Sequence, residues 1–185
     1  MKEDVVISVR NLVKKFGNFT AVDNLDFDVY KGEIFGFLGA NGAGKTTAIR
    51  ILSGLSVPTS GDAIVSGFSA KHQPEKIKQV IGYMCQRFSL YEDLTVRENI
   101  TLYGGIYRMS RKLIKERTAE LLGRLNFEMY ADTLISSLPL GLKQKLAFSV
   151  AVLHDPGIVF LDEPTGGVDP VTRRQFWEMI YETSS

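Results

Sequence analysis

The sequence predicts a mixed α/β fold, and three observations lead to this prediction. Residues 34–38 (IFGFL) form a short continuous apolar run, typical of a central strand buried on both faces, and a glycine-rich loop and a helical stretch follow directly. Two further apolar runs, at 79–85 and 158–161, predict other buried strands of the same sheet. From about residue 90 to 153, apolar residues instead recur at helical spacing, which indicates an insertion made of helices.

The segments around this framework can be assigned in chain order. Residues 5–29 alternate between apolar and polar side chains, which predicts half-buried antiparallel strands near a sheet edge, and Lys31-Gly32 supplies a turn. Residues 46–55 predict a helix with Ile49, Leu52 and Leu55 facing inward, and it should stop near Gly54. A weaker β-rich stretch follows at 61–68.

The helical region carries its own start signals. Thr95 and Glu98 have the spacing of a capping box, which satisfies free N–H groups at the start of a helix. A further amphipathic helix follows Ser110, and another begins near Leu140. After the last predicted strand, residues 173–182 are again helical.

Composition favours one cytosolic domain. The 185 residues fit a single domain, and 22 basic against 21 acidic residues give no field of the kind that attracts nucleic acid. No apolar run approaches the roughly 20 residues needed to cross a bilayer, and the N-terminal residues do not look like a secretory signal. The single cysteine, Cys85, excludes an internal disulfide and agrees with a reducing compartment; a buried apolar role suits it better than redox sensing.

A phosphate-binding loop is the strongest motif. Residues 39–46 (GANGAGKT) match G-x-x-x-x-G-K-[ST] at every fixed position, between a predicted strand and a predicted helix. Glycines let successive N–H groups point at one phosphate chain, which the start of the helix also attracts. Lys45 can reach the β- and γ-phosphates as a catalytic residue, and the Thr46 hydroxyl can coordinate Mg²⁺. The predicted nucleotide-binding residues here are Gly39, Ala40, Asn41, Gly42, Ala43, Gly44, Lys45, Thr46 and Thr47.

Two acids form a second candidate site. Asp162 and Glu163 follow the apolar run at 158–161, and open α/β sheets bind ligands at the carboxyl ends of their strands. Alone, the pair is read more simply as a solvated turn. Together with the phosphate loop it predicts a nucleoside triphosphatase, in which Asp162 helps to hold Mg²⁺ and Glu163 positions or deprotonates the attacking water.

These motifs, with Gln86 after a strand, SLPLGLKQKL at 137–146 and LDEPTGGVDP at 161–170, resemble in order and spacing the nucleotide-binding domain of an ATP-binding cassette (ABC) transporter. The resemblance covers almost the whole chain. It implies a P-loop NTPase fold, with a RecA-like core and an antiparallel β-subdomain at about 1–86 and 154–185. A helical subdomain would be inserted at about 87–153.

The resemblance also suggests roles for single residues. Phe16 stands where the family has the aromatic that stacks on adenine, although a core phenylalanine at a strand end is the alternative. Gln86 looks like the Q-loop glutamine, a catalytic and Mg²⁺-binding residue that senses the γ-phosphate. Asp169 resembles the D-loop aspartate, which acts across a dimer interface; with Pro170 beside it, a plain turn is also possible.

The family signature departs from its usual form. Leu138 and Gly141 match Leu-Ser-Gly-Gly-Gln, whereas Pro139 replaces the serine and Leu140 a glycine. Pro139 removes a hydroxyl and an N–H, but proline suits the first helical position, and the N–H groups of Leu140 and Gly141 remain with the helix dipole. We interpret the motif as a variant that still caps the γ-phosphate held by a second cassette; an ordinary helix start is the alternative.

The resemblance implies an ATP- and Mg²⁺-dependent ATPase on the cytoplasmic face of the cell membrane, which pairs with a second cassette and powers permease subunits. The chain looks most similar to bacterial drug and small-molecule exporters with ABC-2-type permeases. Alternatives are a regulatory cassette that dimerises with little turnover and a soluble ABC ATPase acting on the ribosome or DNA, which the near-neutral charge does not favour.

The family's switch histidine is not found in this sequence. In the family it follows the Walker B glutamate, here Glu163, at a greater distance than the residues up to Ser185 allow, and His72 and His154 lie upstream. We therefore expect the chain to be a fragment in which ATP binding survives better than hydrolysis.

Overall fold

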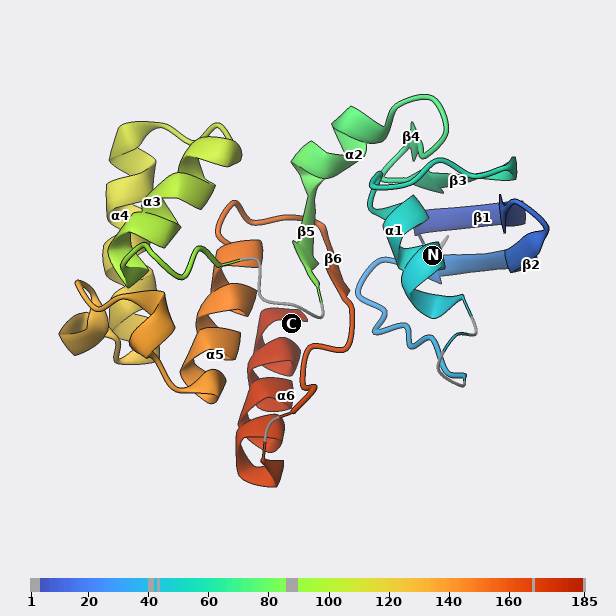
Figure 1. Ribbon diagram of the computed structural model, residues 1–185. Helices are drawn as coiled ribbons and strands as arrows, with labels where there is room; N and C mark the ends of the chain where they lie inside the picture. Colours follow the sequence, from blue (N-terminus) through green and yellow to red (C-terminus); the bar gives the residue numbers. More distant parts are fainter. Residues whose placement is uncertain (1–3, 40–41, 43, 86–89, 168, 185) are drawn as a thin grey trace. The chain divides into compact units, whose positions relative to one another are not determined.

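A computed structural model describes residues 4–39, 42, 44–85, 90–167 and 169–184 of the chain. The contacts of the chain separate it into two compact units (Figure 1). The first, here called the N-terminal unit, comprises Met1–Gly82 together with Ser184–Ser185; the second, the C-terminal unit, comprises Tyr83–Thr183. No helix within the described ranges is both long enough and apolar enough to cross a membrane.

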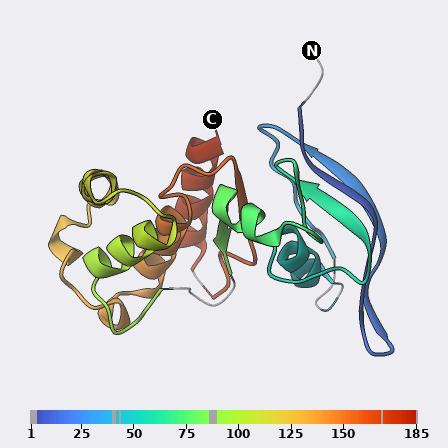
Figure 2. The same cartoon turned by 90° about the horizontal axis from the view of Figure 1, so that it is seen from above.

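The N-terminal unit contains a four-stranded antiparallel sheet, which confirms the predicted antiparallel strands. Strands β1 (Val5–Phe16) and β2 (Phe19–Tyr30) form a long hairpin, visible in Figure 2. Strands β3 (Ser60–Val65) and β4 (Phe68–Ser69) complete the sheet in the order β2-β1-β3-β4. The hairpin turns at Gly17, whose φ of 56° suits a two-residue loop because such turns require left-handed conformations.

A break in register keeps the apolar side chains of β1 on the core side. The pairing of β1 with β2 shifts between Val9 and Leu12, and Asn11 has a φ of 48°. Without the irregularity, strand alternation would place Val9 and Leu12 on opposite faces. Both are fully buried at 0% exposure, so the extra residue allows the two ends of the strand to use one core.

Helix α1 (Lys45–Leu52) contributes Ile49 and Leu52 to this core and ends where Gly54 has a φ of 73°. Leu55, predicted to face inward, is instead 45% exposed, because the helix ends before it. Helix α2 (Pro74–Val80) follows β4 and buries Ile77.

The predicted central strand at 34–38 is wrong for this structure. No strand is assigned at 33–39, and Ile34, Phe35 and Leu38 are 49%, 41% and 97% exposed. An apolar run becomes a buried strand only when strands pair beside it, and no described strand pairs with this segment. The rings of Phe27, Phe35 and Phe37 instead pack together, with centroids 5.0–5.5 Å apart.

In the C-terminal unit, strands β5 and β6 confirm two predicted strands. Strand β5 (Ile81–Met84), which crosses the boundary between the units, pairs with β6 (Ile158–Leu161), and the two lie side by side in Figure 1. The Asp162 N–H donates to the Met84 carbonyl at 2.9 Å, which extends the contact just beyond the strands. The pairing of β5 with β6 thereby brings together Met84 and Asp162, which are far apart in the sequence.

Over its described residues, the C-terminal unit consists mostly of four α-helices and two short 3₁₀ turns, which confirm the predicted helical region. They are α3 (Val96–Ile106), α4 (Arg111–Leu125), α5 (Leu140–Ala151), α6 (Pro170–Ser184) and the turns Glu128–Tyr130 and Ile135–Ser137. Their apolar faces share one core around Ile100, Phe127, Ile135, Leu146 and Phe176, each at most 1% exposed.

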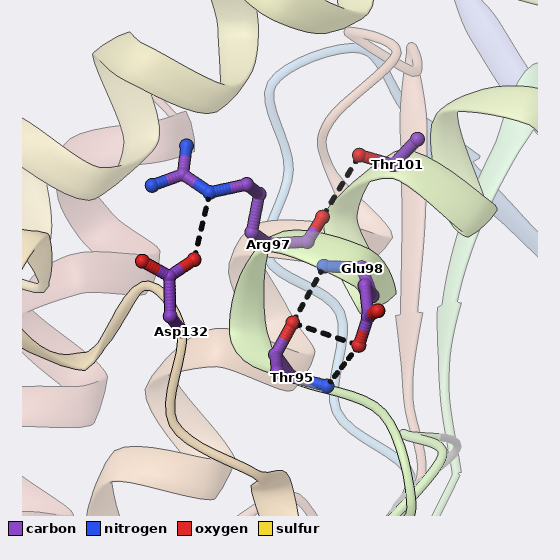
Figure 3. A network of polar contacts seen from close by, with 5 residues as sticks. All are labelled: Thr95, Arg97, Glu98, Thr101 and Asp132. Atoms are coloured by element: carbon purple, nitrogen blue, oxygen red, sulfur yellow. Dashed lines mark hydrogen bonds and ion pairs between the residues drawn. The ribbon is translucent and has the colours of Figure 1, made fainter.

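The predicted capping box starts α3. The Thr95 N–H donates to the Glu98 carboxylate at 2.8 Å, and the Glu98 N–H donates to the Thr95 hydroxyl oxygen at 3.2 Å (Figure 3). Arg97 in the same turn pairs with Asp132 at 3.1 Å. The first turn of α3 is therefore held by its own capping bonds and by an ion pair to Asp132, in the segment that leads to α5.

Candidate nucleotide-binding site

The phosphate loop of the N-terminal unit requires glycine at its end. Gly44 occupies the N-cap of α1 with a φ of 82°, and a Cβ added there would lie 2.0 Å from the carbonyl oxygen of Ala21. Gly42, with a φ of 85°, also holds a left-handed conformation. No side chain among the described residues caps α1, so the start of the helix keeps its attraction for an anion.

Lys45 bends back across this loop. Its ammonium donates to the carbonyl oxygen of Gly39 at 2.6 Å, which places the positive charge over the loop. Thr46 is exposed and Thr47 half-buried in the first turn of α1. The remaining predicted loop residues, Ala40, Asn41 and Ala43, lie outside the described residues.

Phe16 is not a core residue, so the alternative considered for it is wrong. It ends β1 with 55% of its surface exposed, and the Lys14 ammonium lies 5.1 Å from the centre of its ring. Phe19, its partner across the hairpin, is 61% exposed. An exposed ring offers a flat apolar surface that can stack on a base.

The two acids after β6 lie in different environments. Asp162 is only 4% exposed, whereas Glu163 is exposed. Glu163 also has a φ of 51°, an unusual conformation for a residue with a side chain and one that recurs at functional sites. The Gly166 N–H donates to the Glu163 carbonyl at 3.1 Å and closes a turn after the strand. Cys85, near this strand end, is half-buried, and Gln86 lies outside the described residues.

The variant signature starts α5 without a side-chain cap among the described residues. Pro139 lies at the N-cap with a φ of −57°, one residue before the first helical position predicted for it. Its carbonyl accepts the N–H groups of Leu142 and Lys143 at 3.0 Å. The N–H groups of Leu140 and Gly141 come before Leu142 in the first turn of α5. At these positions a helix provides no backbone carbonyl to accept an N–H group.

A pocket of about 410 Å³ joins the signature to the predicted D-loop residue within the C-terminal unit. A Cβ at Gly141 would approach the Thr172 side chain to 2.8 Å, so glycine allows α5 and α6 to meet closely there. The structure thus brings together Leu140, Gly141 and Asp169. Residues lining the pocket include Leu140, Gly141, Lys145, Gly167, Asp169 and Gln175.

Asp169 also caps α6. Its carboxylate accepts the Thr172 hydroxyl and the N–H groups of Thr172 and Val171, both at 3.0 Å. The Thr172 hydroxyl, followed by these N–H groups, lowers the pKa of Asp169 below its ordinary value. Its negative charge is therefore held at the start of a helix, where it is stabilised, and this capping agrees with the structural alternative of a turn.

Sequence reasoning missed two polar residues of α5. Lys145 lines the pocket, and Gln144, only 2% exposed, donates its amide to the Gly166 carbonyl at 3.4 Å. Helical spacing is a signal that could have found Lys145, because it follows Gly141 by one turn. Gln144 gives no such signal, since its contact depends on the path of a distant loop.

Solved structures of similar fold are nucleotide-binding proteins. An ATP-binding subunit of an ABC transporter superposes with a TM-score of 0.84 at 28% identity, over 97% of this chain and 75% of that one. An ATP-binding cassette solved as a dimer in a post-hydrolysis state with ADP and Pi gives a TM-score of 0.83 at 26% identity, over 97% and 83%. These similarities confirm the predicted fold class.

Curated relatives are transporter subunits. The chain is 46% identical over 174 residues to the probable multidrug ABC transporter ATP-binding protein YbhF of Escherichia coli strain K12, covering 94% of this chain and 30% of that protein. It is 36% identical to the Nod factor export ATP-binding protein I of Cupriavidus metallidurans, covering 95% and 58%. The chain thus spans less than a third of the first relative's length.

A family model described as ABC transporter matches residues 22–166, well over half of the chain, and this range includes the phosphate loop, the variant signature and both acids. The chain therefore belongs to the ABC transporter family.

Proposed function

We propose that the chain is a nucleotide-binding domain that binds MgATP and hydrolyses ATP to drive a membrane exporter. The observation that carries the proposal is the phosphate loop, in which Gly44 tolerates no side chain and Lys45 already lies across the loop. A loop of backbone N–H groups with one lysine at a helix start suits the polyphosphate of a nucleotide.

A residue of the chain can be assigned to each part of MgATP and to the attacking water. Lys45 exchanges the Gly39 carbonyl for phosphate oxygens, and Phe16 offers its exposed ring to adenine. The Thr46 hydroxyl and the Asp162 carboxylate would supply oxygen ligands of the kind that Mg²⁺ prefers, and Gln86 would be a further ligand of the same ion. When bound, Mg²⁺ neutralises charge on the phosphates. Glu163, exposed beside Asp162, positions the attacking water and accepts its proton.

A second cassette completes the proposed site. The start of α5, with Leu140 and Gly141, would cap the γ-phosphate that the partner cassette holds, and Asp169 would contact that partner. The pocket and the uncapped helix start support this arrangement. Closure of two such cassettes on two nucleotides is the step that would do work on the permease.

The transporter assignment rests on the relatives. We infer an exporter because their names include multidrug transport and Nod factor export, and ABC-2-type permease subunits are the partners we propose. The domain would act on the cytoplasmic face of the cell membrane and would not bind nucleic acid. We also propose the subdomain division of about 1–86 with 154–185 around a helical 87–153.

Sedimentation of the Glu163→Gln variant with and without MgATP tests the proposal. Slowing hydrolysis should trap the closed pair, so we expect a dimer that forms only with MgATP. Adding Lys45→Ala to that variant is the control, since it should remove nucleotide binding and leave a monomer. A protein that binds ATP yet stays a monomer would contradict the paired mechanism. Dimerisation without phosphate release by the wild-type protein would favour the regulatory alternative.

A further inference from the structure

The pocket between α5 and α6 contains a lysine that the assigned site does not use. Lys145 is half-buried and lies four residues, about one turn, after Gly141. Lys145 lines the pocket together with Pro139 and Leu140 at the start of the helix. Gly141 itself packs against the Thr172 side chain, so Lys145 borders the pocket beside this close contact.

The ammonium of Lys145 is held in place without being neutralised. It donates to the amide oxygen of Gln175 at 3.0 Å, and no carboxylate within the described ranges forms an ion pair with it. An ammonium has three donors, so this neutral partner leaves capacity for an anion. Gln175 on α6 restricts the side chain without cancelling its charge.

Lys143, on the same helix, provides a contrast. Its ammonium forms an ion pair with Glu92 at 3.1 Å, and it does not line the pocket. Two lysines two residues apart therefore differ in what they face: one is matched by a carboxylate, the other faces a cavity. Residues two apart point to different sides of a helix, so Lys143 is a control that has the same charge on the same helix but faces away from the pocket.

Asp169 is the carboxylate that could oppose an anion in the pocket. Its oxygens already accept two backbone N–H groups and the Thr172 hydroxyl at the start of α6. These bonds stabilise its charge locally and direct it toward its own helix. Among the described residues, the pocket thus keeps two features that attract an anion: the Lys145 ammonium, which has no carboxylate partner, and the start of α5, which has no side-chain cap.

We propose that Lys145 binds the γ-phosphate of the nucleotide held by a second copy of the chain, in place of the hydroxyl that Pro139 lacks. The proposal rests on the proposed function and deepens it, because it names a phosphate-binding residue of the paired site. A charged donor makes a stronger bond to phosphate than a hydroxyl does. The variant signature then exchanges one neutral hydrogen bond for a charged one.

The test compares variants in the Glu163→Gln background, by sedimentation at saturating MgATP. A hydrogen bond to a charged group changes binding by about tenfold or more, and a symmetric pair contains two, so Lys145→Gln should weaken dimerisation about a hundredfold. Lys143→Gln should leave it unchanged. Lys145→Arg, which keeps the charge and the donors, should retain most of the dimer.

Two further measurements separate phosphate binding from a packing role. Circular dichroism and nucleotide binding by the monomer should be the same in Lys145→Gln as in its parent, because the phosphate loop is untouched. Added salt should weaken the parent dimer more steeply than the Lys145→Gln dimer, since one charged contact per site has gone.

The outcomes distinguish this inference from the proposed function. If Lys145→Gln dimerises as tightly as Lys143→Gln, or if Lys145→Arg is as weak as Lys145→Gln, the inference is overturned and the proposed function stands. If the Glu163→Gln parent forms no dimer with MgATP bound, both are overturned.

Discussion

Gly44 shows how one residue determines whether the phosphate loop can form. Its backbone is left-handed, and the Ala21 carbonyl oxygen occupies the position of a side chain. The end of the loop therefore lies in direct contact with β2, the strand that carries Ala21. Gly42, only two residues away, has the same type of conformation, but nothing lies within 4 Å of its missing Cβ.

This difference gives a prediction with an internal control. Gly44→Ala should lower the free energy of unfolding by more than about 3 kcal/mol, because it adds a clash with backbone to an unfavourable φ. Gly42→Ala should lower it by about 1 kcal/mol, from φ alone. Urea unfolding without nucleotide measures both values. Equal losses would mean that the Ala21 contact does not restrict the loop.

Single residues also show how far the sequence predicts the site. The motif spacing identified the phosphate loop, the two acids and the unusual signature, because these depend on neighbours along the chain. It did not distinguish a buried Asp162 from an exposed Glu163, which depends on what packs against the end of β6. The spacing from Gly141 places Lys145 on the same side of its helix, but the contact of Lys145 with Gln175 depends on α6, a separate helix.

Among the elements, α3 has the most complete start. Thr95 and Glu98 each accept a hydrogen bond from the other's backbone N–H, whereas the Thr101 hydroxyl, in the second turn of the helix, donates to the Arg97 carbonyl (Figure 3). The Glu98 pKa is lowered, first by the Thr95 N–H and then by the Thr95 hydroxyl, so the box is strongest with Glu98 ionised.

We predict that Thr95→Ala lowers the free energy of unfolding by about 1 kcal/mol, since it removes the N-cap oxygen. Thr101→Ala should change it by less than about 0.5 kcal/mol, because it removes no cap. Urea titrations followed by circular dichroism at neutral pH compare the two. A loss at Thr101 equal to that at Thr95 would show that the start of α3 is held by packing and by the Arg97 pair.

Helices whose starts and apolar faces are marked in the local sequence were predicted correctly. The segment whose structure depends on pairing with distant strands was not. The start of α3 and the periodic apolar faces of α4 and α5 are local properties of the sequence. Residues 34–38 have the apolar content of a central strand, yet a strand also needs ladder partners, and no described strand supplies them here. Composition predicts that such a run prefers burial, but it cannot predict which segments will cover it.

For the molecule as a whole, nucleotide should act as a stabilising ligand. At a hundredfold excess over its dissociation constant, MgATP should raise the free energy of unfolding by about 2.7 kcal/mol, because it binds only the folded chain. Thermal unfolding with and without MgATP measures the shift. Lys45→Ala should abolish it, and chelation of Mg²⁺ should reduce it. An unchanged melting temperature at saturating MgATP would contradict a formed phosphate site.

The close contact of α5 with α6 also has a mechanical consequence. Two helices that touch at one point can pivot, but helices that interlock at successive turns resist both sliding and twisting. The contacts recur along both helices, at Gly141 with Thr172, Lys145 with Gln175 and Phe148 with Phe176. In the proposed pair of cassettes, a force on the start of α5 would therefore move α6 with it, and little of the work of closure would be lost in bending between the two helices.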